Sequence, residues 1–136
     1  MKPAVMIAVA LITLALLCFT IATAALARSR RAGAVVVWGL TLGVILDAAA
    51  TLSMWVAAGR LLLNAHSLLG WTALFGMLAV GGAAWRHRWN KGPQARIGDR
   101  MDRYARLAYA YWVIAYVTGV AVGMTRAAHR HVSLVL

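Results

Sequence analysis

Four long apolar runs dominate this chain and constrain its fold more than any other feature. They cover about residues 4–27, 34–58, 65–85 and 105–125, and basic or polar residues lie between them. A helix that crosses a bilayer needs ~20 mainly apolar residues, so each run is long enough to span a membrane. The sequence therefore predicts an all-α, four-transmembrane-helix bundle with up-down-up-down topology, formed as a single integral membrane domain over residues 1–136.

The composition supports this membrane class. Of the 136 residues, 63% are hydrophobic and 12% are charged. In typical soluble domains about 25% of the residues are charged. Four spans also use nearly all of the chain, which excludes a separate soluble domain or a nucleotide-binding fold.

Basic residues are distributed unevenly between the predicted connections. By the positive-inside rule, this bias predicts a cytoplasmic loop at residues 86–104 and both termini outside. Topology thus explains the net charge of +11, and we predict no nucleic-acid partner. We predict contact with the lipid bilayer and with anionic lipid at the cytoplasmic face, worth about 1 kcal/mol per Lys or Arg. Ten basic residues lie on the cytoplasmic side and four on the other, namely Arg28, Arg30, Arg31, Arg86, Arg88, Lys91, Arg96, Arg100, Arg103 and Arg106 against Lys2, Arg60, Arg126 and Arg130.

The second run carries Asp47, the only acidic residue outside segment 97–103. A carboxylate at the bilayer centre costs roughly 2.5–3.5 kcal/mol on an insertion scale. Gly39, Gly43, Thr51 and Trp55 lie before and after it at steps of four, and this spacing places all five residues on one ridge of a helix. We expect the ridge to face the other helices, with Gly39 and Gly43 as helix-packing residues.

Two interpretations of Asp47 remain open from the sequence. The carboxyl group is either a protonatable or ligand-binding group inside the bundle, or a neutral acid whose hydrogen bonds fix the helix register. A rise of ~1.5 Å per residue places it ~16 Å below the outer end of its helix, level with residues 111–115 of the fourth run. The predicted intramembrane polar site comprises Asp47, Thr51 and Tyr111, with the Tyr111 hydroxyl as the expected partner.

His66 opens the third run near the outer mouth. It differs from Asp47 in depth by ~13 Å, so we expect no hydrogen bond between the two. His66 is a candidate ligand or haem contact, but a b-type haem usually needs two axial ligands from facing helices. Only His129 lies near the same rim. We therefore predict no cofactor and no metal site, and retain haem b only within an alternative function.

The fourth run and its approach carry two further patterns. Gly119 and Gly123 form a small-xxx-small pair, which predicts helix packing. Before the run, Asp99 and Asp102 each precede an arginine by four residues, an arrangement that stabilises a helix. We expect the fourth helix to begin near Arg96, and we assign the two acids a structural role only.

Three features occur together in this chain: Leu46-Asp47 followed by Thr51, the segment Asn64-Ala65-His66-Ser67-Leu68-Leu69-Gly70, and an aromatic fourth run with Trp112 and Gly119. With them, the chain resembles the HsmA-like family of small four-helix bacterial and archaeal membrane proteins. The resemblance implies the four-helix layout and some role for Asp47 and His66, with no settled activity. We expect the protein to be a multi-pass protein of a bacterial plasma (inner) membrane. The third run also resembles b561-type cytochromes superficially, but it lacks a late histidine, which puts a paired-histidine haem site in doubt.

No catalytic set is evident, and we expect no enzyme. The sequence predicts a small integral membrane protein built around a buried Asp, either a transport or ligand-binding bundle or an accessory subunit of a membrane complex. The alternative is an electron-transfer or quinone- or haem-linked membrane subunit that uses His66. A homodimer or a larger membrane complex remains open as the oligomeric state.

Overall fold

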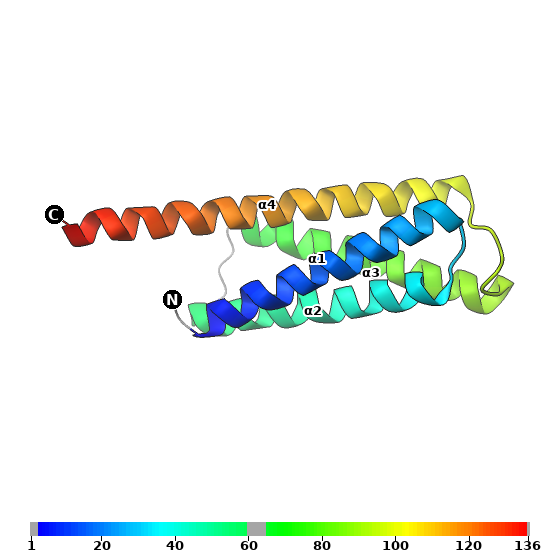
Figure 1. Ribbon diagram of the computed structural model, residues 1–136, viewed down its shortest axis with the longest axis horizontal. Coiled ribbons are helices and arrows are strands. Elements are labelled where there is room, and N and C mark those ends of the chain that lie inside the picture. Colours follow the sequence, from blue (N-terminus) through cyan, green and yellow to red (C-terminus); the bar gives the residue numbers. More distant parts are fainter. Residues whose placement is uncertain (1–2, 60–64, 136) are drawn as a thin grey trace.

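The computed structural model is a bundle of four helices (Figure 1). It describes residues 3–59 and 65–135, apart from the side chains of residue 127 and residues 130–135. The predicted all-α, up-down-up-down bundle is confirmed, and each helix is long and apolar enough to cross a membrane. The helices are α1 (Pro3–Ser29), α2 (Ala34–Ala58), α3 (Ala65–Lys91) and α4 (Asp99–Val135).

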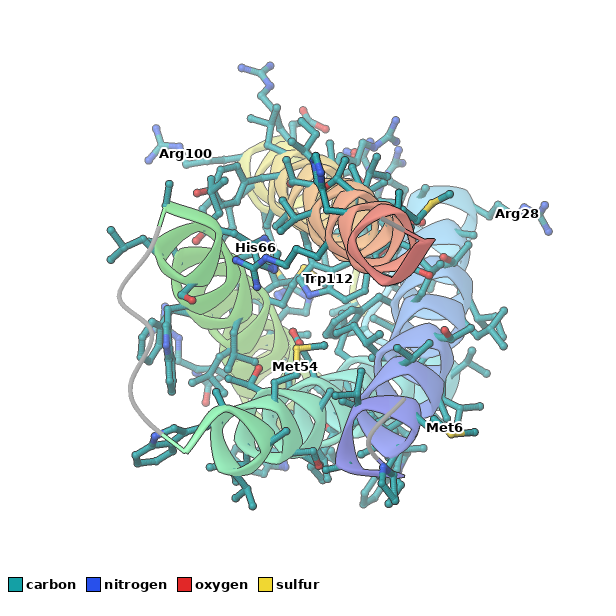
Figure 2. All side chains as sticks on the ribbon, turned by 90° about the vertical axis from the view of Figure 1, so that its left-hand side faces the viewer. Met6, Arg28, Met54, His66, Arg100 and Trp112 are labelled. Carbon is teal, nitrogen blue, oxygen red and sulfur yellow. The ribbon has the colours of Figure 1, made fainter. Side chains whose placement is uncertain are left out.

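The helices occupy the corners of a square in chain order (Figure 2). α1 and α3 each pack against both α2 and α4, whereas the diagonal pairs have no close backbone approach in the described part of the chain. Much of the outer surface consists of exposed aliphatic and aromatic side chains, as in a protein surrounded by lipid. This arrangement fits a small multi-pass membrane protein.

The two ends of the bundle differ. Connections 30–33 and 92–98 share one end, which we call the basic pole, and both termini lie toward the other end (Figure 1). There α4 projects past its neighbours, because it has 37 residues where α2 has 25. From the sequence, the segment after residue 131 is too short to span a membrane and is expected to fray, but α4 is helical as far as Val135. Asn64, which the sequence offers as the N-cap of the third helix, lies outside the described residues.

Small residues let α1 and α2 approach closely. A Cβ atom added at Gly39 would lie 2.9 Å from the Ala22 Cβ, and one at Gly43 would overlap the Phe19 ring. Phe19 is fully buried and packs with Leu40 and Met77 in one continuous core. The predicted packing residues Gly39 and Gly43 therefore lie in the α1–α2 contact, and Gly43 provides the space that the Phe19 ring fills.

The helices extend beyond the predicted spans at the basic pole. α3 continues to Lys91, so the cytoplasmic loop expected at 86–104 is reduced to residues 92–98. Arginine and lysine are good helix formers, which allows α3 to continue past the apolar run. Gly92, with a φ of 89°, and Pro93 then end the helix.

The two connections of the basic pole lie against each other. Arg31 and Arg96 form an isolated antiparallel bridge, and the Ile97 backbone N–H donates to the Arg30 carbonyl at 2.8 Å. Because residues 96 and 97 are engaged in this pairing, α4 begins at Asp99 and not near Arg96, where the sequence predicted it.

We predict that Gly43→Ala destabilises the bundle by about 1–3 kcal/mol, the usual cost of overpacking a well-filled core. The new methyl group would displace the Phe19 ring, which packs edge-on against Trp112 and has little freedom to move. Gly82→Ala is the matched control, because its Cβ would meet nothing within 4 Å. Denaturant unfolding in detergent micelles measures both variants, and equal midpoints would contradict the assigned contact.

Candidate functional site

A hydrogen bond between diagonally opposite helices lies at the centre of the bundle. The indole Nε1–H of Trp112 on α4 donates to Oδ2 of Asp47 on α2 at 2.7 Å. Asp47 is 5% exposed and Trp112 is 3% exposed. An intramembrane carboxyl group thus has a directed donor within the core, as buried polar groups generally require.

Aromatic side chains surround this hydrogen bond. The Phe19 ring meets the Trp112 indole edge-on, with centroids 5.0 Å apart and planes at 78°. The Tyr116 ring stacks on the same indole, with centroids 5.8 Å apart and planes at 16°. The indole is therefore held by packing on α1 and α4 while its N–H points at Asp47. Figure 2 shows Trp112 directed into the interior of the bundle.

The sequence predicted Tyr111 as the partner of Asp47, and this prediction was wrong. The Tyr111 hydroxyl instead pairs with the Thr72 hydroxyl on α3 at 2.7 Å. The depth estimate for α4 was right, since Trp112 lies within residues 111–115, but the side of the helix was wrong. Residue 112 is seven positions before Gly119, about 20° from its direction around the axis, whereas residue 111 is about 80° away. The seven-residue spacing with Gly119 was the signal that identifies Trp112.

Thr51 contributes to the site only through local structure. Its hydroxyl donates to the backbone carbonyl of Asp47, one turn earlier, at 2.9 Å. This is the ordinary back-bonding of a helical threonine. Of the predicted polar site, Asp47 occupies the interior, Thr51 bonds to the backbone beside it, and Tyr111 faces α3.

His66 lies in a different layer of the bundle, against Gly119. A Cβ atom at Gly119 would be 2.7 Å from the His66 Cε1 atom, so the glycine makes room for the imidazole ring. Gly119 is seven residues beyond Trp112, about 10 Å along α4. His66 Nδ1 is buried and has no hydrogen-bond partner among residues 3–59 and 65–135.

The structure does not bring a second histidine to His66 within its described residues. His129 is exposed and lies ten residues beyond Gly119, about 15 Å further along α4. His87 is at the basic pole, where its Nε2 atom lies 3.1 Å from the Ala95 carbonyl oxygen. Of the predicted glycine pair, Gly119 contacts His66, but a Cβ at Gly123 would meet nothing within 4 Å.

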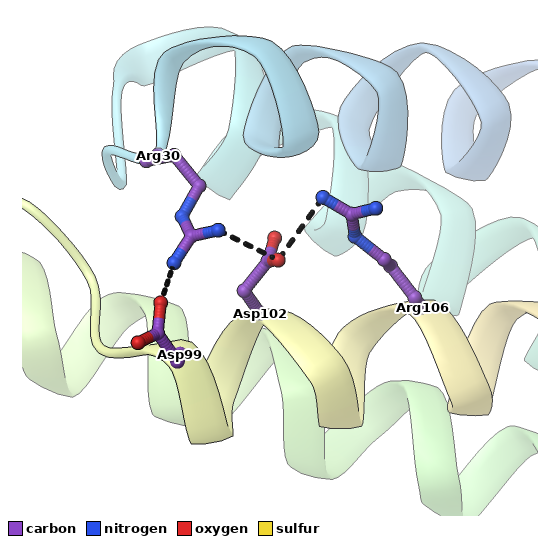
Figure 3. Close-up of polar contacts among 4 residues, drawn as sticks. All are labelled: Arg30, Asp99, Asp102 and Arg106. Carbon is purple, nitrogen blue, oxygen red and sulfur yellow. Dashed lines mark hydrogen bonds and ion pairs between the residues drawn. The ribbon is translucent and has the colours of Figure 1, made fainter.

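A second polar cluster lies between α1 and α4 at the basic pole (Figure 3). The guanidinium group of Arg30 binds both Asp99 and Asp102, the latter at 3.1 Å, and Arg106 binds Asp102 at 3.1 Å. The expected Asp102–Arg106 pair is present, but Asp99 pairs with Arg30 and not with Arg103. Sequence reasoning missed Arg30, because its position depends on a φ of 53° that follows the end of α1.

Comparison of this chain with protein-family models, curated proteins and solved structures finds no match. Functional inference therefore depends on the geometry of these two polar clusters and of His66.

We predict that Trp112→Phe destabilises the bundle by about 1–3 kcal/mol or more, because it leaves the Asp47 carboxyl group buried without this donor. The control is Tyr111→Phe, which removes the hydroxyl bond to Thr72 at a half-exposed site and should cost less than about 1 kcal/mol.

Trp112→Phe also removes ring volume, so a double-mutant cycle with Asp47→Leu is needed to isolate the hydrogen bond. We expect a coupling energy of about 0.5–3 kcal/mol between the two sites from unfolding in detergent. Strict additivity of the two changes would contradict the interaction.

Proposed function

We propose that this protein is a non-enzymatic accessory subunit of a membrane complex, in which the buried acid holds the bundle together. The observation that carries the proposal is the Asp47–Trp112 hydrogen bond in a closely packed core. The one intramembrane carboxyl group is thereby committed to an internal contact. Its role is to fix which faces of α2 and α4 turn inward.

Transport fits this geometry less well. A proton relay needs a chain of titratable groups or water that connects the acid to both sides of the membrane. The group that binds Asp47 is the indole of Trp112, and the ring of Phe19 packs against that indole; neither side chain titrates. His66, the histidine toward the outer side, lies about two helical turns away along α4.

The length of α4 also supports an accessory role. Its 37 residues extend over about 55 Å, whereas the 25 residues of α2 extend over about 38 Å. Figure 1 shows the C-terminal end of α4 projecting past the other helices, and the C-terminal part of this helix carries the exposed residues Arg126 and His129. A rigid helix that projects from the bundle offers a partner protein a surface that the bundle itself does not cover.

We assign the basic pole to the cytoplasmic side of a bacterial plasma membrane, with the termini outside. The excess of basic residues at this pole supports the assignment. The resemblance to the HsmA-like family belongs to the same proposal and rests on the sequence features around Asp47, His66 and Trp112.

The experiment compares Asp47→Asn with Asp47→Val in cells that express the tagged chain. The asparagine oxygen still accepts from Trp112, so we expect native stability and an unchanged complex size on native electrophoresis. Valine removes the acceptor and leaves the indole N–H unpaired, so we expect a stability loss of about 1–3 kcal/mol and less assembled complex. A folded Asp47→Asn variant that abolished a proton-driven uptake, measured in vesicles, would instead establish transport.

A second candidate function, a quinone- or haem-linked electron-transfer subunit, is favoured by one observation. His66 Nδ1 is buried with no hydrogen-bond partner in the described part of the chain, as a group that awaits a ligand would be. An absorption spectrum of the purified protein tests the haem version, and a Soret band that His66→Gln removes would support it. For the quinone version, we expect titration with a soluble quinone to change tryptophan fluorescence in the wild type and not in His66→Gln. The absence of both signals would exclude this candidate.

A further inference from the structure

The interior of the bundle is well packed toward the basic pole but not toward the end that carries the termini, which we call the outer end. The last buried residue of α2 is Ala50, the first of α3 is Ala73, and the last of α4 among its described side chains is Ala115. In the described chain, only α1 has a residue that is buried further toward the outer end, Ala8. Near the outer end, the inward faces of the other three helices are therefore not fully covered by their neighbours.

Three residues near the outer end point inward and yet stay partly accessible. Each lies seven residues outward from a buried residue of its own helix, and seven residues return a side chain to within about 20° of the same direction. The pairs are Asp47 and Met54 on α2, Ala73 and His66 on α3, and Trp112 and Gly119 on α4. Figure 2 views the bundle from the outer end and shows Met54 and His66 directed toward the interior, as is Trp112. Met54 is nevertheless 42% exposed, so the interior is open around it.

The surroundings of Gly70 show the same open space on α3. Gly70 and Gly81 lie on nearly the same face of this helix, because eleven residues are about three turns. A Cβ atom at Gly81 would lie 3.8 Å from the Leu40 Cβ, whereas one at Gly70 would meet nothing within 4 Å. We call the open space at the outer end, which is bounded by four residues, the outer chamber. These residues are Met54, His66, Gly70 and Gly119.

Asp47 and Trp112 lie at the inner end of the outer chamber. The indole takes Oδ2 of Asp47, and Oδ1 has no hydrogen bond with the described residues. Oδ1 is also not among the polar atoms that packing seals off without a partner, in contrast to Nδ1 of His66. Toward the basic pole the core is closed, since Leu40 and Met77 are at most 1% exposed. The second carboxyl oxygen is therefore accessible from the side of the outer chamber.

The chemistry of the outer chamber favours a small cation. The carboxyl group of Asp47 is the only acidic group among its residues, and a primary ammonium group supplies both the positive charge and the N–H donors that Oδ1 can accept. The indole of Trp112, with the Tyr116 ring stacked on it, adds an aromatic surface of the kind that attracts a cation. Seven residues of helix separate Asp47 from Met54, so the chamber is ~10 Å deep. Glycine at positions 70 and 119 leaves room for a slender apolar body.

We propose that the outer chamber binds a small primary ammonium compound whose apolar body is no longer than about 10 Å. The ammonium group donates to Oδ1 of Asp47 while Trp112 continues to donate to Oδ2. The apolar body lies beside Gly70 and ends near Met54 and His66. This inference goes beyond the accessory role, because the same carboxyl group stabilises the fold through one oxygen and binds the ligand through the other.

The test measures thermal unfolding of the full-length protein in detergent micelles with two amines, phenethylamine and n-butylamine, and with their neutral analogues, 2-phenylethanol and 1-butanol. A ligand that binds only the folded state raises the unfolding midpoint as its concentration increases. We expect both amines to raise the midpoint of the wild type and neither alcohol to do so. Asp47→Asn keeps an acceptor for Trp112 but loses the negative charge, so its affinity for the amines should fall at least about ten-fold.

A second variant fills the outer chamber without touching the carboxyl group. Gly70→Leu should abolish the response to both amines and leave the midpoint without ligand nearly unchanged, because a Cβ there meets nothing within 4 Å. Gly82→Leu is the matched control. Gly82 lies on the exposed side of the same helix, and a Cβ there also meets nothing within 4 Å, so this variant should respond to the amines as the wild type does.

Three results would overturn the proposal. A wild-type midpoint that neither amine raises would show that water alone occupies the outer chamber. Equal increases with an amine and its alcohol would show that the apolar body binds without the carboxyl group. Unchanged amine affinity in Asp47→Asn or in Gly70→Leu would place the amine elsewhere on the protein. None of these results bears on the accessory role, which is tested separately by the size of the complex in Asp47→Val.

Discussion

A carboxyl group inside an apolar bundle must be hydrogen-bonded, and the interior of this protein is organised around that requirement. Removing such a group from water without a partner is costly, so the donor of Trp112 must reach Asp47 across the diagonal of the square. Two residues of α1 and α2 make this reach possible. Gly43 has no side chain, Phe19 fills the resulting space, and its ring supports the indole edge. One polar contact thus fixes the rotation of two helices and the packing of a third.

The basic pole is held by a different kind of interaction. The core depends on aromatic packing around a single hydrogen bond, whereas the pole depends on ion pairs and on backbone pairing between two connections. Arg30 takes part in the ion pairs and in the backbone pairing. Its guanidinium group binds two acids at the start of α4, and its carbonyl oxygen accepts from the Ile97 backbone N–H. Polar contacts at mid-depth and at the pole therefore both join the α1–α2 hairpin to the α3–α4 hairpin.

The sequence predicts the four helices well, because their apolar runs are long and nothing competes with a helix in lipid. It also predicts that Gly43 and Asp47 lie on the inward face of α2, which follows from the turn of about 100° per residue, and the depth at which α4 meets this face, which follows from the constant helical rise. The prediction was wrong for Trp55, which was expected on the same inward ridge and is 47% exposed. The sequence prediction named Tyr111 as the partner of Asp47, whereas the donor is Trp112. Depth does not distinguish neighbouring residues of a helix, because their side chains differ by about 100° in direction around the axis and by only ~1.5 Å in height. The prediction fails on Arg30 for another reason: a positive φ at a residue other than glycine depends on contacts from residues about 70 positions later.

The separation of Asp47 and Trp112 along the chain has a consequence for biogenesis. The two residues are 65 positions apart. At a synthesis rate of about 5–20 residues per second, the acid emerges several seconds before its donor. During that interval α2 must remain in the membrane with an unpartnered carboxyl group, against an insertion cost of roughly 2.5–3.5 kcal/mol. The aliphatic residues of α2 and its close contact with α1 offset this cost, which makes the first hairpin the platform on which the second completes the bundle.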